Sequence, residues 1–508
     1  MYAIACVLLL TGAAYRLCLT SQLPVGYDEV FVMAVGLEEM EALGAPGWIE
    51  IPIRRSAAIT PLWWWAQYVA SHLAGGISLS AIRVLPILLG FAAMATAYLC
   101  ARRRFGRRVG IVFMGLIALS DIVAFTNSRS EFSESLALLF LIPLVCWTGG
   151  EGRSVTRGLL WLGLVMTGLS KGVFVIGLCT LAELAIVAAA RCARARRIGG
   201  LAISLVIAAI PTTAYLVVAS RAFADRGVIQ HDAISTNGVM ELITELTFHY
   251  ATIKAHVTGG VRDAALVYLD VGIWPVCALT GLPLLAGFLA SCLPALRQGR
   301  KRNARTDVTR IGLCVWVSVG LGVILARGTA GARFHLLYLP ALWLLGALWL
   351  GPHMRRPSAK WVAGASLAVW CVAVLAAGPL IWARFSRFEP MYGSDELKLL
   401  DDFRAGRTGA PDPIDRTLHI DMANYHLRAE GDDRGRLDRR WHLERAVHHA
   451  RKETERAPAD ARAWFYLGES LRQSGASVDF VCETWRKGLR IKPNEALQQR
   501  VSAFCGGE

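Results

Sequence analysis

The sequence lacks the cysteine patterns that bind metal ions. Its 508 residues include 12 cysteines, but no pair has Cys-x-x-Cys spacing or the Cys/His spacing of a zinc site. Ten of them lie in or beside apolar segments, where cysteine packs as a small hydrophobic side chain. Only Cys482 and Cys505 lie in a polar region, and the sequence leaves open whether they form a disulfide.

The first apolar segment, residues 3–20, lacks the features of a cleaved secretory signal. It has neither a basic stretch before it nor a small-x-small cleavage site after it. The segment is long enough to cross a bilayer, so we expect a retained transmembrane helix.

Apolar residues dominate the rest of the chain. Hydrophobic residues make up 54% of it, 16 residues are Trp, and the mean hydropathy is +0.42. A soluble protein of this size has no need for so much apolar surface, so the sequence predicts an all-α polytopic membrane protein. Runs long enough to span predict about 11 transmembrane helices, near 3–20, 80–101, 109–126, 132–148, 158–170, 172–190, 199–219, 266–296, 308–326, 334–350 and 360–383.

The net charge of +15 is concentrated in this apolar part. Residues 1–383 hold 32 of the 54 Lys and Arg but 18 of the 39 Asp and Glu. With about 11 spans and the amino terminus inside, every strongly basic joint falls on the cytoplasmic side, as the positive-inside rule expects. Topology therefore explains the basic excess, and nucleic-acid binding is not expected. We expect a multi-pass protein of the bacterial inner membrane.

The first loop outside the membrane, residues 21–79, has helical patterning. The pair Asp28 and Glu29 opens it and suits an interfacial site that binds a cation or accepts a proton from a hydroxyl. Because neighbours on a helix point about 100° apart, we expect one of the two to face the site. Apolar residues then recur at helical spacing, with three acids predicted on the opposite, solvent face: Val30, Met33, Ala34, Leu37 and Met40 against Glu38, Glu39 and Glu41. Pro61 begins a second, Trp-rich helix suited to the headgroup region.

The tail, residues 384–508, alternates acidic and basic residues and has helices of soluble length. We expect it to form an extracytoplasmic helical domain. Within about 440–493 the spacing of its small and aromatic residues resembles a tetratricopeptide repeat: Trp464, Leu467, Gly468, Leu471, Gly475, Trp485, Gly488 and Pro493. One repeat and a half is too few for a free solenoid, so it packs on the membrane domain, residues 1–383, or docks a protein partner.

Several ionisable residues lie at the predicted outer ends of different spans. Placing a charged group at membrane depth costs free energy, so each such residue indicates a structural or functional role. Arg16 either snorkels to the interface or binds phosphate. The next external turn carries Arg129 with Glu131 and Glu134, acids that either share a site or lie in a first turn capped by Ser130. Lys171 is a candidate phosphate contact, and the tenth span opens with a further basic and aromatic group, Arg333, His335 and Tyr338.

Together these features resemble the GT-C membrane glycosyltransferases. The resemblance covers about residues 10–350 and is most specific at Asp28-Glu29, which follow an arginine near the end of the first span. The external turn at Arg129 and the Lys171-Gly172 turn add to it. Within this superfamily, the chain resembles the bacterial dolichyl-phosphate-mannose-type and aminoarabinose transferases. The resemblance implies a polyprenyl-phosphate-linked sugar donor, an extracytoplasmic acceptor (lipid, glycan or protein) and often a divalent metal ion.

The resemblance also implies residue roles. Asp28 matches the catalytic acid position, with Glu29 beside it, and Glu131 matches the second-loop acid. The metal ligands it implies are Asp28 and Glu131. Groups expected near the donor phosphate are Arg16, Arg129, Lys171, Arg333, His335 and Tyr338. Two departures stand out: the second-loop acid is more usually Asp, so Glu131 or Glu134 fills that position here, and the tetratricopeptide-like tail is not a shared element.

Two other functions fit parts of the sequence. A transporter or flippase of a lipid-linked or anionic substrate would carry charges in mid-span and matched inverted repeats. The sequence shows no clear inverted repeat, and its charges gather at the outer face. A scaffold that recruits proteins through the tail would leave the interfacial acids unexplained.

Overall fold

The computed structural model describes residues 2–22, 25–26, 29–55, 61–147, 154–167, pieces within 202–214, 309–320 and 336–353, and residues 417–429, 437–493 and 495–506. Throughout these ranges the regular structure is helical, with no strand, as the sequence predicts. The chain divides into two compact units. Unit 1 comprises residues 1–23, 52–67 and 83–392, and unit 2 comprises residues 24–51, 68–82 and 393–508.

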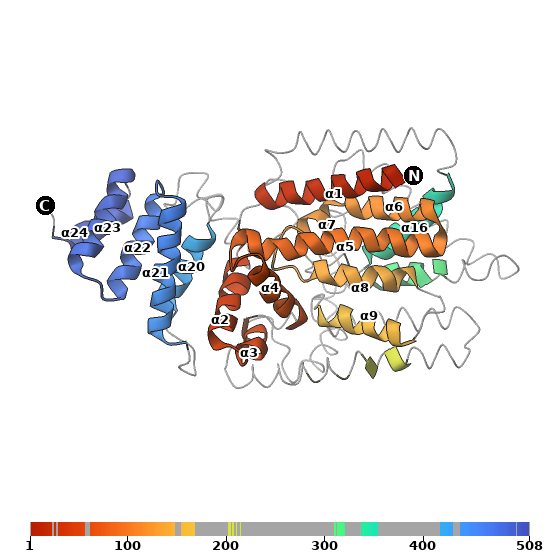
Figure 1. Ribbon diagram of the computed structural model, residues 1–508, viewed down its shortest axis with the longest axis horizontal. Helices are drawn as coiled ribbons and strands as arrows, with labels where there is room; N and C mark the ends of the chain where they lie inside the picture. Colours follow the sequence, from red (N-terminus) through yellow and green to blue (C-terminus); the bar gives the residue numbers. More distant parts are fainter. Residues whose placement is uncertain are drawn as a thin grey trace, which may run out of the picture. The chain divides into compact units, whose positions relative to one another are not determined.

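Unit 1 is a bundle of apolar helices that run side by side along nearly one direction (Figure 1). Its principal helices in the described part are α1 (Tyr2–Gln22), most of α5 (Leu79–Phe105), α6 (Arg107–Ala118), α7 (Asp121–Thr126), α8 (Glu134–Cys146), α9 (Ser154–Met166) and α16 (Leu339–His353). Within the described residues, two helices, Tyr2–Thr20 and Leu79–Phe105, have the length and apolar composition to cross a membrane. They coincide with the expected spans 3–20 and 80–101, while the count of 11 stays a prediction.

Small residues let these helices approach closely. A Cβ atom added at Gly12 of α1 would lie 2.9 Å from both the Cβ of Ala118 and the sulfur of Met94, on α6 and α5. Without a hydrophobic driving force in lipid, such close packing is a main source of helix association. The expected span 109–126 is divided, because α6 ends at Ala118 and α7 begins at Asp121, with the hydroxyl of Ser120 accepting from the amide of Val123.

Unit 2 combines part of the first loop with the tail. The loop gives a π-helical turn η1 (Glu29–Ala34), α2 (Val35–Leu43) and parts of α3 (Gly47–Arg55) and α4 (Pro61–Leu73). The tail gives α20 (Leu418–Arg428), α21 (Arg439–Arg456), α22 (Ala461–Gln473), α23 (Val478–Ile491) and α24 (Glu495–Phe504). The apolar face predicted for the loop is confirmed, since Val30, Met33, Ala34, Leu37 and Met40 are all fully buried.

The predicted solvent face of that loop helix is wrong for two of its three acids. Glu38 and Glu39 are buried, and only Glu41 is exposed. The reason is tertiary: polar side chains of α20 and α21 contact both buried carboxylates. Helical periodicity identified the apolar side but not what covers the polar one.

The repeat-like segment forms a helical hairpin of α22 and α23. Gly468 leaves room for the indole of Trp485, and a Cβ at Gly488 would lie 2.8 Å from the Cβ of Trp464. Gly475 ends the turn after α22 with φ +80°, a conformation that favours glycine. The disulfide question is also answered: Cys482 and Cys505 are bonded, which ties α23 to the end of α24.

Candidate functional site

The turn between α7 and α8 is a polar segment buried inside unit 1. Its residues Asn127, Ser128, Arg129, Ser130 and Glu131 are each no more than 5% exposed. Turns normally lie on the surface, because their backbone groups need hydrogen-bond partners. A buried polar turn must find those partners inside the protein, and this one does.

Arg16 supplies part of that support from α1. Its Nε donates to Oδ1 of Asn127 at 3.0 Å, and its other nitrogens donate to the carbonyl oxygens of Gly12, Ala118 and Ile117 at 2.8–3.1 Å. The guanidinium thus satisfies carbonyls at the end of α6 and holds the first residue of the turn. Arg16 is fully buried among protein groups, and a phosphate would have to compete with these carbonyls for it.

Asn127 extends this network into α8. Its Nδ2 donates to Oγ of Ser135 at 3.0 Å, and that hydroxyl donates to the carbonyl of Thr126 at 3.0 Å. Gly90 of α5 makes space for the pair, because a Cβ there would lie 2.7 Å from Oδ1 of Asn127 and 3.0 Å from Nε of Arg16.

Helix α4 fixes the middle of the turn. Nε1 of Trp63 and Nε2 of Gln67 both donate to the carbonyl oxygen of Ser130, at 3.0 and 3.1 Å. Ser130 therefore does not act as the helix cap that the sequence allowed; the residue before α8 is Ser133, whose side chain forms no capping hydrogen bond. The Trp-rich helix thus acts as a brace for the turn.

The turn presents Arg129 and Glu131 as a buried ion pair. Nη1 of Arg129 lies 3.2 Å from Oε1 of Glu131, and both side chains are almost fully enclosed. Glu134 lies in the first turn of α8, where a carboxylate is favoured by the helix dipole. Oε1 of Glu131 faces the guanidinium of Arg129 and Asp28 lies outside the described residues, so a metal ion bound by these two acids stays a prediction.

Two further polar residues are buried in unit 1. Arg83, in the first turns of α5, donates to the carbonyl of Thr20 near the end of α1 at 2.8 Å. Tyr338 is fully buried just before α16, where Gly320 leaves space for its ring. The role predicted for Tyr338 at the donor phosphate stays a prediction, while the sequence did not indicate the contacts of Arg83, Trp63 and Gln67.

In the first loop, Glu29 is the described member of the acid pair. It is fully buried, and its Oε2 accepts from the backbone amide of Gly26 at 3.0 Å, which closes a local turn. The remaining predicted site residues, Asp28, Lys171, Arg333 and His335, lie outside the described residues.

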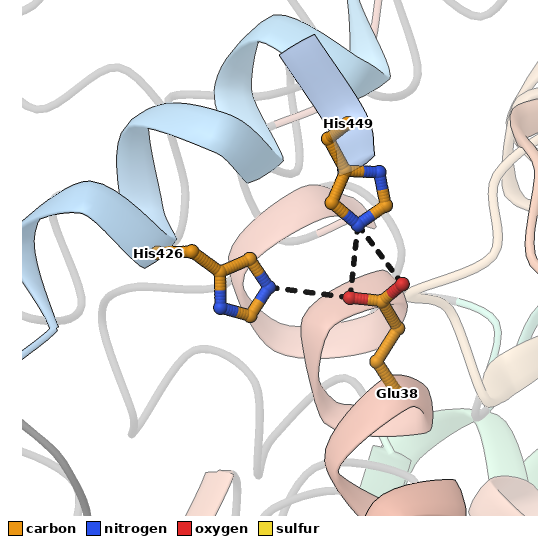
Figure 2. A group of neighbouring side chains, drawn as sticks. All are labelled: Glu38, His426 and His449. Atoms are coloured by element: carbon orange, nitrogen blue, oxygen red, sulfur yellow. Dashed lines mark hydrogen bonds and ion pairs between the residues drawn. The ribbon is translucent and has the colours of Figure 1, made fainter. Parts of the chain in front are cut away.

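Unit 2 contains a second buried cluster that sequence reasoning missed. Glu38 of α2, His426 of α20 and His449 of α21 point toward one another (Figure 2). Nε2 of His426 lies 3.2 Å from Oε2 of Glu38, and Nε2 of His449 lies 2.9 and 3.0 Å from its two oxygens. Arg445 also contacts Oε1 of this carboxylate.

The electrostatics of this cluster favour the ionised form of the Glu38 carboxylate and the neutral form of the His426 imidazole. Burial alone would raise the pKa of Glu38, but hydrogen bonds from His426 and His449 and the charge of Arg445 hold that pKa well below its ordinary value. Burial lowers the pKa of His426, and burial together with nearby positive charge lowers the pKa of His419 to about 3.

A sequence signal for this cluster did exist. His419 and His426 are seven residues apart, and so are His442 and His449, which places each pair on one face of its helix two turns apart. The spacing could not identify Glu38, the third residue of the cluster, because it lies 388 residues before His426.

Comparison with known proteins gives structural neighbours but no sequence relatives. Neither a protein-family model nor a curated protein matches the chain. The fold is similar to ArnT from Cupriavidus metallidurans in the apo state, with 16% identity and a TM-score of 0.48 over 96% of this chain and 91% of that one. The same protein bound to undecaprenyl phosphate matches at 14% identity and a TM-score of 0.45, over 99% of this chain and 77% of that one.

An archaeal protein is similar at the same level. It is the oligosaccharyltransferase AglB from Archaeoglobus fulgidus in complex with an inhibitory peptide and a dolichol-phosphate, at 13% identity and a TM-score of 0.45, over 85% of this chain. This chain spans 58% of the length of AglB.

Proposed function

We propose that the chain is a membrane glycosyltransferase that moves a sugar from a polyprenyl-phosphate donor to an acceptor outside the cytoplasm. One observation above all supports this: a polar turn with the ion pair Arg129–Glu131 lies buried in an apolar bundle, held by Arg16 of α1 and by Trp63 and Gln67 of α4. Ionisable groups in such surroundings are costly and are a mark of function.

The chemistry of the transfer assigns each group a task. The acceptor oxygen or nitrogen attacks the anomeric carbon, the bond from that carbon to the phosphate oxygen breaks, and the lipid phosphate leaves with the electron pair. In the proposal Asp28 orients the acceptor and takes its proton. Arg129, with Lys171 and Arg333, stabilises the charge that develops on the departing phosphate.

Glu131 positions Arg129 in this scheme. A carboxylate beside a guanidinium fixes the direction of the fork and keeps the pair neutral until an anionic substrate arrives. Hydrogen bonds to Asn127 and to the carbonyl of Ser130 hold the turn in place, and fixed placement is what electrostatic stabilisation of a transition state needs.

The proposal places the tail outside the cytoplasm. The disulfide between Cys482 and Cys505 supports this placement, since such bonds persist in the periplasm and outside the cell and are rare in the cytosol.

The neutral variant Asp28→Asn tests the proposed reaction in cells. A deletion strain complemented with this variant should lack the sugar on its cell-envelope glycans or lipids by mass spectrometry, whereas the wild-type chain restores it. Glu41→Gln is the matched control, because it neutralises an exposed acid of the same loop and should also restore the sugar. Restoration by Asp28→Asn, at wild-type protein level in the membrane, would contradict the proposed role.

A further inference from the structure

Three potential metal ligands converge in unit 2 at the junction of α2, α20 and α21. They are one carboxylate and two imidazole nitrogens, all buried, and their atoms lie within 4.8 Å of one another. In Figure 2 both rings direct Nε2 at the carboxylate of Glu38. Two histidines and one glutamate are a ligand set that zinc commonly takes in proteins.

The spacing of these atoms suits a metal ion. Zinc binds nitrogen and oxygen ligands at about 2.0–2.2 Å, so neighbouring ligand atoms in a tetrahedral shell lie about 3.3 Å apart. Here Oε2 of Glu38 lies 3.2 Å from Nε2 of His426 and 3.0 Å from Nε2 of His449. Oε2 is thus the oxygen that both rings share, and a small outward movement admits an ion.

The other oxygen of Glu38 contacts a guanidinium. Arg445 contacts Oε1, which leaves Oε2 for the ion. Ligating carboxylates in metal sites are often hydrogen-bonded in this way, and the outer partner fixes which oxygen binds. The guanidinium also offsets the negative charge of the carboxylate.

Each ligating ring has a second histidine behind it. Nδ1 of His426 lies 2.9 Å from Nδ1 of His442, and Nδ1 of His449 lies 3.1 Å from Nδ1 of His419. A metal-bound imidazole usually donates its remaining N–H to such an acceptor, which fixes the tautomer and orients the ring. Each of the two helices, α20 and α21, therefore supplies one inner imidazole, next to Glu38, and one outer imidazole.

We propose that Glu38, His426 and His449 bind a divalent ion of the zinc class that joins the first-loop helix to the tail. Imidazole ligands favour zinc over magnesium and calcium, which prefer all-oxygen shells. The site differs from the one implied by the resemblance, which involves Asp28 and Glu131. It ties α2, in residues 24–51, to α20 and α21, in residues 393–508, which together form unit 2.

Metal content of the purified full-length protein tests the proposal without any assay of activity. After dialysis against weak chelator, the wild-type chain should retain about one zinc ion per chain by mass spectrometry of elements. Glu38→Gln, His426→Ala and His449→Ala should each lose most of it. His448→Ala is the control, because it removes the neighbouring imidazole on α21 that is not among the three ligands and should keep its zinc.

Thermal unfolding in strong chelator keeps the test valid if a variant folds poorly. Chelator should lower the Tm of the wild-type chain and of His448→Ala, and should leave the Tm of His426→Ala unchanged. A wild-type chain that holds no zinc and whose Tm is indifferent to both chelator and added zinc would overturn the proposal. The cluster would then be a hydrogen-bonded network only.

The outer histidines give a finer test of the same site. His442→Ala and His419→Ala should keep the stoichiometry of binding but weaken zinc affinity by about 10- to 100-fold, the usual effect of removing an outer-shell partner. Equal affinity in these variants and the wild-type chain would contradict the assignment of the outer imidazoles. Failure of sugar transfer would leave all of these measurements unaffected.

Discussion

Arg129 and Glu131 show how the meaning of a charged residue depends on its surroundings. Written in the sequence, they are two charges in a short turn; in the structure they are enclosed and face each other at 3.2 Å. Breaking a buried ion pair from one side leaves an uncompensated charge, which costs about 3–5 kcal/mol.

A double-mutant cycle separates stability from function at this pair. Arg129→Gln should lower stability by about 3 kcal/mol or more, because the buried carboxylate of Glu131 loses the guanidinium that faces it. Adding Glu131→Gln should recover much of that stability but none of the transfer activity, since the positive charge at the leaving phosphate is still absent. Chemical denaturation and a transfer assay measure the two effects. Recovery of activity in the double variant would show that Arg129 acts only through packing.

Gly90 provides a residue-level test of the support beneath the turn. In Gly90→Ala the new methyl group would lie 2.7 Å from Oδ1 of Asn127 and 3.0 Å from Nε of Arg16, and overpacking of this kind costs about 1–3 kcal/mol. Thermal unfolding in detergent should show a clear fall in Tm. Gly115→Ala is the matched control, because its Cβ would meet only the flexible end of Leu8 at 3.3 Å. Equal Tm values for the two variants would count against the close Arg16–Asn127 contact.

At the scale of elements, sequence periodicity correctly predicted helices and their buried faces where packing follows the apolar pattern of a single helix. It identified the apolar face of residues 30–40, the spans 3–20 and 80–101, and the helical hairpin of the tail, in which Gly468 leaves room for the indole of Trp485 and Gly488 for the Cβ of Trp464. It failed at Glu38 and Glu39, because their burial depends on helices almost 400 residues away in the chain. It also missed the brace from Trp63 and Gln67, since a Trp-rich helix has the same composition whether it lies in headgroups or holds a turn.

Helix α22 gives a test of local structure in the tail. The Asp460 side chain accepts from the amide of Arg462 at the start of the helix and pairs with its guanidinium. Burial alone would raise the pKa of Asp460, but the hydrogen bonds and charge of Arg462 outweigh it and lower the pKa. The folded state therefore favours the ionised form, and this stabilisation is present near neutral pH and lost on acidification through the lowered pKa.

Asp460→Ala should accordingly lower stability near neutral pH by about 1 kcal/mol, the usual cost of losing a helix cap. The difference from the wild-type chain should shrink as the pH falls, which denaturation at several pH values measures. Asp479→Ala is a control, since Asp479 follows the first residue of α23 and does not cap that helix. A pH-independent difference would show that the cap acts without its charge.

At the scale of the whole molecule, the chain joins a membrane bundle to a helical tail through segments that alternate between two units. Composition was enough to predict an apolar helical bundle, because it sums over many residues, whereas the orientation inferred from the charge asymmetry stays a prediction. The candidate site was predicted only in part. The sequence indicated that Arg16 and the turn at Arg129 are candidate site residues, whereas their hydrogen-bond partners are set by packing between distant helices. The roles of Asp28, Lys171, Arg333 and His335 stay predictions.

Release of the lipid product by purified protein tests the proposed function most directly. The full-length chain, incubated with a panel of undecaprenyl-phosphate sugars and a cell-envelope extract as acceptor, should convert one donor to undecaprenyl phosphate, as followed by mass spectrometry. Asp28→Asn should release none, and Glu41→Gln should match the wild-type chain. A wild-type chain that moves lipid-linked sugars across vesicle membranes without cleaving them would contradict the account and identify a transporter.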